Sequence, residues 1–115
     1  MFIRSQPIEP VRLTAAAAII YTAPTNFRGT VKQLTATNTT ATARTITVYR
    51  VPSGGSPSTT NTVISAETIP PSGNGNKSLA DRFANQVLNP GDTLQALCSA
   101  ADAVSMTGGV IEEAV

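Results

Sequence analysis

Apolar and polar side chains alternate along several short stretches of the chain, which is the pattern of β-strands with one buried face. The cleanest example is 44–51, where Ile46 and Val48 share one face while Thr45 and Thr47 share the other. Threonine suits such positions because its β-branched side chain favours strands and its hydroxyl tolerates water. The pattern therefore predicts a strand at 44–51 with a core-facing side and a polar side.

The same alternation or a β-branched composition predicts further strands at 17–22, 29–38, 61–69, 93–98 and from 104 to about 110. Within 29–38, Val31 is out of step with Leu34, Ala36 and Asn38, and we expect a one-residue bulge near Lys32–Gln33 to bring them into line. The segments that separate these strands are rich in proline, glycine, asparagine and serine, as turns are: 23–26, 52–57, 70–76 and 89–92.

Residues 77–88 leave two alternatives open. In the first, Ser78 caps a short helical turn through Asp81. In the second, the segment is an irregular strand that ends at Val87 and Leu88. Of the two we expect the strand.

About seven or eight short strands with regular turn signals predict an all-β fold, an antiparallel β-sandwich of the jelly-roll-like or Ig-like kind. Residues 14–115 form a single sandwich domain in this interpretation, with Phe27 and Phe83 as the bulky core residues. Residues 1–13 are predicted to be an extended N-terminal arm, because Pro7 and Pro10 disfavour a helix there. Its apolar residues indicate packing, either on the parent domain or on a neighbouring subunit.

The amino-acid composition excludes several classes of function but adds little to the prediction of the fold. The chain has 115 residues, of which 13% are charged, and a formal net charge of +1. Such a weak field does not steer a protein to nucleic acid, so no specific nucleic-acid binding is expected. The chain has no histidine, which excludes Ser-His-Asp and Cys-His catalysis and most zinc sites. The single cysteine, Cys98, is predicted to be a small buried hydrophobe.

The carboxylates give no sign of a catalytic pair or a metal site. Asp81, Asp92 and Asp102 occupy positions where a cap or a turn needs an oxygen acceptor, and Glu112 and Glu113 have the appearance of a solvated tail. We therefore expect no catalytic residue, no bound metal and no cofactor. The start of the chain does not have the apolar run of a secretory signal, and no segment is apolar for long enough to cross a membrane as a helix.

Several stretches resemble small β-sandwich accessory proteins of tailed-bacteriophage virions. They are 13–26, 35–40, 48–55, 64–66 and 87–96, and they include the turns Tyr21-Thr22-Ala23-Pro24-Thr25-Asn26 and Asn89-Pro90-Gly91-Asp92. The resemblance covers roughly residues 13–110 and rests on turns and strand edges. It implies a structural protein that is made in the host cytoplasm and located in the virion.

The first functional hypothesis is accordingly a non-enzymatic capsid decoration or cement protein that binds the major capsid protein and stabilises the shell. Self-association is also expected, because a small aliphatic core stabilises a domain of this size only modestly. A neck or tail accessory or fibre-anchoring protein is the alternative, and a carbohydrate-binding receptor module comes third. The residues predicted to bind the partner lie in the arm: Phe2, Ile3, Arg4, Ile8, Val11 and Arg12.

Overall fold

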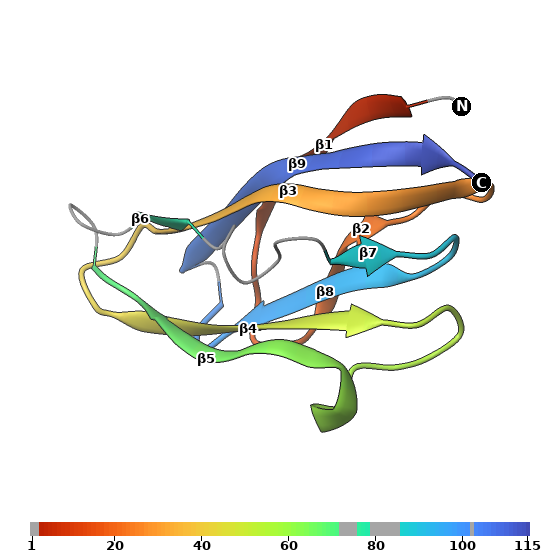
Figure 1. Cartoon of the computed structure of the whole chain (residues 1–115). Helices are drawn as coiled ribbons and strands as arrows, with labels where there is room; N and C mark the ends of the chain where they lie inside the picture. Colours follow the sequence, from red (N-terminus) through yellow and green to blue (C-terminus); the bar gives the residue numbers. More distant parts are fainter. Residues whose placement is uncertain (1–2, 72–75, 79–85, 102) are drawn as a thin grey trace.

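A computed structural model describes residues 3–71, 76–78, 86–101 and 103–115 of the chain. Two antiparallel β-sheets lie face to face with the core between them (Figure 1). The predicted all-β sandwich is thus confirmed. The helical residues of the described part are confined to a short 3₁₀ turn, η1 (Thr59–Asn61). No helix among the described residues is long and apolar enough to span a bilayer.

The first sheet, called sheet A, is built around the last strand of the chain. Its order is β1 (Ile3–Arg12), β9 (Val104–Ala114), β3 (Phe27–Asn38) and β6 (Asn76–Ser78), and β7 (Val87–Leu88) also pairs with β3. Every pairing is antiparallel. Strands from the two ends of the chain therefore lie side by side in one sheet.

The second sheet, sheet B, has the order β2 (Ala18–Thr22), β8 (Thr93–Cys98), β4 (Arg44–Val51) and β5 (Thr62–Ile69). Its pairings are also antiparallel. The chain crosses repeatedly between the sheets, and first and last strands pair, an arrangement typical of a jelly roll.

Side-chain alternation places the core where the sequence predicts it. Ile46 and Val48 of β4 are fully buried, as are Leu94 and Ala96 of β8, while the intervening threonine and glutamine residues are partly exposed. Cys98 is buried as a free thiol. The bulge expected near Lys32–Gln33 is confirmed, because the pairing of β3 with β9 shifts register between Val31 and Gln33.

The ends of the segment 77–88 are strand in the structure, at β6 and β7. Residues 79–85, with Asp81 and Phe83, and also Asp102 lie outside the described residues. Phe27, the other predicted core aromatic, is only partly buried, and the described core is aliphatic apart from Tyr21.

The segment expected to be an extended arm is extended, but it is an integral strand of sheet A. Strand β1 pairs with β9 from Ile3 to Arg12, with a register shift between Ile8 and Val11. Ile8 and Leu13 are each only 1% exposed. Of the two packing alternatives, the structure therefore shows the segment packed on its own domain.

Two adjacent glycines of β9 differ sharply in the space around them. A Cβ on Gly108 would lie 2.1 Å from the Gln33 carbonyl oxygen, whereas the nearest atom to a Cβ on Gly109 is 3.9 Å away. We expect Gly108→Ala to lower the free energy of unfolding by about 2 kcal/mol, because the backbone of β3 must move. Gly109→Ala is the matched control and should leave it nearly unchanged. Urea unfolding of both variants measures the difference, and equal losses would contradict this packing.

Candidate partner-binding site

The six residues predicted to bind a partner fall into three groups in the structure. Ile3 is 56% exposed on the outside of the sandwich, and Phe2 lies outside the described residues. Ile8 is in the core and Val11 packs against it, so neither offers its side chain to a partner in this fold. Arg4 and Arg12 make contacts within the chain. Among the described residues of the predicted set, Ile3 is thus the apolar one whose side chain is accessible to a partner.

Arg4 belongs to a polar cluster at the end of the sandwich where the termini lie (Figure 1). Its Nε donates to Glu112 Oε1 over 2.7 Å, and the other carboxylate oxygen accepts a 2.5 Å hydrogen bond from the Tyr21 hydroxyl. The Glu112 side chain is 2% exposed, and that of Arg4 is 35% exposed. One carboxylate therefore connects β1 and β9 of sheet A to β2 of sheet B.

Two more contacts fix this cluster. The Arg4 guanidinium lies 4.0 Å from the centroid of the Phe27 ring, a cation–π arrangement. Gly29 leaves room for the phenol, because a Cβ there would come 2.8 Å from the Tyr21 hydroxyl. This cluster was not among the sites predicted from the sequence, in which Glu112 was expected with Glu113 in a solvated tail. For Glu112 that prediction was wrong, since Glu112 points inward opposite Arg4 and Gly29.

Burial, followed by the hydrogen bond to Glu112, raises the pKa of Tyr21 above its ordinary value of 10.0, while Arg4 acts in the opposite direction. The folded state then keeps the phenol neutral at a pH where the unfolded chain loses that proton. Stability from this group is present below about pH 10 and is lost above it, at up to about 1.4 kcal/mol per pH unit.

As the pH rises from about 9 to about 11, we expect the urea midpoint of unfolding to fall less for Tyr21→Phe than for the wild type. Tyr49, on the outside of sheet B, is the control, since Tyr49→Phe retains the Tyr21 phenol. Urea titrations at several pH values test this. A wild-type midpoint that falls no more steeply than that of Tyr21→Phe would exclude the effect.

A second polar cluster lies around Asp92, in the turn before β8. Its carboxylate accepts hydrogen bonds from the backbone of Ser53 and Asn89, each over 3.0 Å, and from Arg50 Nη2 over 3.2 Å. Its backbone carbonyl accepts from Ala23 N, and the Ala23 carbonyl accepts from Gly91 N. The predicted role of Asp92 as a turn acceptor is confirmed. Through its carboxylate and its backbone together, this turn is joined to two others that are far apart in the sequence, at 23–26 and 52–57.

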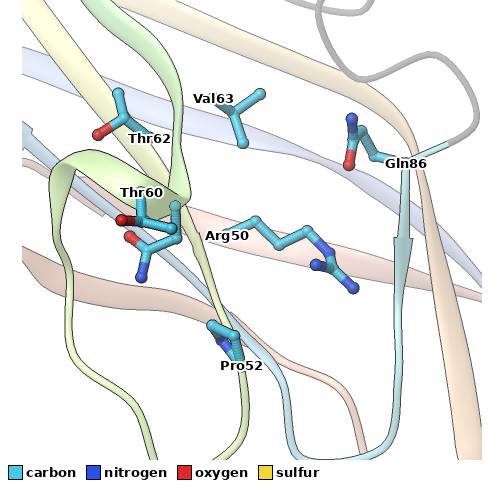
Figure 2. A pocket seen from close by; sticks show the side chains of 7 residues that line it. Arg50, Pro52, Thr60, Thr62, Val63 and Gln86 are labelled. Carbon is cyan, nitrogen blue, oxygen red and sulfur yellow. The ribbon is translucent and has the colours of Figure 1, made fainter.

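Arg50 extends from this cluster along a cleft of about 290 Å³ between β4, η1 and the segment before β7 (Figure 2). Its Nε donates to the Val87 carbonyl over 2.9 Å, so the side chain bridges the two sheets. The lining residues are Arg50, Pro52, Thr60, Asn61, Thr62, Val63 and Gln86. Among the described residues, no three His, Cys, Asp or Glu side chains come together as a metal site.

Comparisons with known proteins identify the fold and not a family. No protein-family model matches the chain, and no curated protein matches it. Among solved structures it is similar to one from Bacillus, described as "Bacillus endospore appendages form a novel family of disulfide-linked pili", with 20% identity and a TM-score of 0.53. The similarity covers 98% of this chain and 88% of that chain. At this level of identity the similarity shows a shared fold.

Proposed function

We propose that this chain is a structural protein of a tailed-bacteriophage virion, a decoration or cement protein that binds the major capsid protein. It acts by burying surface between subunits and not by chemistry. Repeated over many symmetric sites, a modest interface on each copy adds up to a large stabilisation of a shell.

The observation that supports this proposal is where the residues of the resemblance lie. The segments 21–26, 48–55 and 87–96 are distant in the sequence but meet around Asp92 through hydrogen bonds of Ala23, Arg50 and Ser53. Three of the five stretches on which the resemblance to small virion proteins rests thus contribute residues to one end of this sandwich. Among the described residues, the well-buried carboxylates are those of Asp92 and Glu112, and both accept hydrogen bonds that hold strands and turns together. This arrangement favours a structural role over an enzymatic one.

The test is the number of copies in purified particles of the encoding phage, counted by mass spectrometry against the major capsid protein. Hundreds of copies support a position on the shell. A dozen or fewer support the neck or tail alternative. Absence from the particles would contradict both.

A second measurement locates the contact. Deleting β1 is unsuitable, because it removes Ile8 from the core and exposes the edge of β9. Ile3→Asp is suitable, since Ile3 is 56% exposed. When the variant is added to particles that lack the protein, we expect it to fill fewer binding sites than the wild type does. Ala41→Asp is the control, because Ala41 is exposed in the β3–β4 turn at the other end of the sandwich (Figure 1). If both variants bind like the wild type, the contact does not lie at β1.

The structural similarity favours one further candidate, a subunit that polymerises into a filament. The similar Bacillus structure is described as forming disulfide-linked pili. This chain has a single cysteine, and Cys98 is 1% exposed, so disulfides between many copies have no accessible thiols to use. Filaments of purified protein in negative-stain electron micrographs would favour this candidate over the decoration protein.

A further inference from the structure

The outward surface of sheet B carries no charged side chain among the described residues of its four strands. Strand pairing shows why. The three charged residues of these strands are Arg44, Arg50 and Glu67, and they pair directly with Ile69, Leu94 and Ile46, each of which is fully buried. Directly paired residues of antiparallel strands share a face of the sheet. All three charged residues therefore lie on the core side.

The opposite side of sheet B presents neutral side chains. One row across all four strands consists of Ile19, Gln95, Tyr49 and Thr62. The next row pairs Leu97 with Thr47. These residues are partly exposed, and Ile19 is 55% exposed. We call this surface the neutral face and define it by Ile19, Thr45, Thr47, Tyr49, Gln95 and Leu97.

Sheet A provides the contrast within the same molecule. Its outward surface carries Arg28 and Glu113, which pair across β3 and β9 and form an ion pair there. It also carries Arg12, opposite Ser105. Absence of charge is thus a property of one side of the sandwich. The cores of protein interfaces are likewise depleted in charged residues.

We propose that the neutral face is the contact between two copies of this chain, stacked face to face about a two-fold axis. A surface without charge meets its own copy with no like-charge repulsion and with no ion to desolvate. Two twisted sheets pack well when their strands are nearly aligned. The inference does not rest on the proposed virion function, because it follows from the strand register and the positions of the charges.

The size of the face sets the strength of the contact. Strands of five to eight residues, rising about 3.3 Å per residue and lying about 4.8 Å apart, cover about 430 Å² per copy, or about 860 Å² in the pair. That total is the size of a weak, transient interface. The dimer is therefore expected to depend on concentration, with a dissociation constant between about 10 μM and about 1 mM.

Sedimentation equilibrium of the purified chain over that range of concentration is the test. We expect the wild type to dimerise and Leu97→Lys to weaken the dimer at least about tenfold, because the two introduced charges meet across the interface. Thr35→Lys is the matched control. Thr35 is also partly exposed on a central strand, but on the outward side of sheet A, and the variant should dimerise like the wild type.

Thr45→Lys is a second variant of the neutral face, needed if Leu97→Lys fails to fold by circular dichroism. It should also weaken the dimer. A wild type that stays monomeric at the highest concentration would overturn the proposal, as would a dimer that Thr35→Lys disrupts and the two face variants do not. If the wild type is monomeric and Leu97→Lys no longer binds particles, the neutral face contacts a coat subunit instead. Particle copy number is independent of all these outcomes, so failure of the dimer and failure of the virion function are distinguishable.

Discussion

Glu112→Ala is expected to lower the free energy of unfolding by about 3 kcal/mol, the lower end of the range for breaking a buried ion pair. The substitution leaves Arg4 without its carboxylate and the Tyr21 hydroxyl without its acceptor, and both partners converge from different strands. The lower end applies because the Arg4 side chain is 35% exposed and water compensates part of its loss. Chemical denaturation monitored by circular dichroism measures the change.

The neighbouring residue provides the control. Glu113 forms an ion pair with Arg28, but the side chains are 30% and 44% exposed, so Glu113→Ala should cost at most about 0.5 kcal/mol. A second variant, Glu112→Gln, keeps one acceptor oxygen and should lie between the two. If Glu112→Ala and Glu113→Ala lose the same stability, Glu112 does not hold the two sheets together.

Asp92→Ala is expected to cost about 2–3 kcal/mol. The side chain is 8% exposed and accepts three hydrogen bonds, two from backbone nitrogens and one from Arg50. Its removal leaves the backbone N–H donors of Ser53 and Asn89 without this acceptor at a partly buried site, and leaves Arg50 without its carboxylate. Thermal unfolding followed by circular dichroism gives the size of the loss.

The conservative variant separates geometry from charge. Asp92→Asn keeps one oxygen acceptor in the turn but loses the charge that faces Arg50, and we expect roughly half the loss of Asp92→Ala. A melting temperature of Asp92→Ala equal to that of the wild type would show that the turns are held by their backbone bonds alone, such as those between Ala23 and Asp92.

The strands and the core were predictable because both follow from local periodicity. A period of two is visible in the sequence at 44–51 and 93–98, and burial follows it in the structure. Even the bulge of β3 follows from Val31 being out of step with Leu34. For these elements, comparing each residue with the one two positions along the chain is enough to predict the strand and its buried face.

The site could not be predicted in this way, because its partners are distant in the chain. Arg4 and Glu112 are separated by 108 positions, and adjacent glutamates in the sequence have different environments that depend on strand register. A faint signal was present: Val104, Met106, Gly108 and Val110 alternate, and continuing that period to 112 places Glu112 on the buried face. Whether residues 3–12 pack on their own domain or on a neighbouring subunit was left open by the sequence for a similar reason, since the paired strand comes from the other end of the chain.

The place of β9 between β1 and β3 sets an order of events during biosynthesis. Until residues 104–114 have been synthesised, β1 and β3 are not joined to each other, and the nascent polypeptide exposes Ile8 and Leu34 to water. Sheet A therefore closes only after residues 104–114 have left the exit tunnel, through contacts of long sequence separation that form slowly. A stop codon that removes β9 should yield an insoluble fragment, because the edges of β1 and β3 that pair with β9 would be left unpaired.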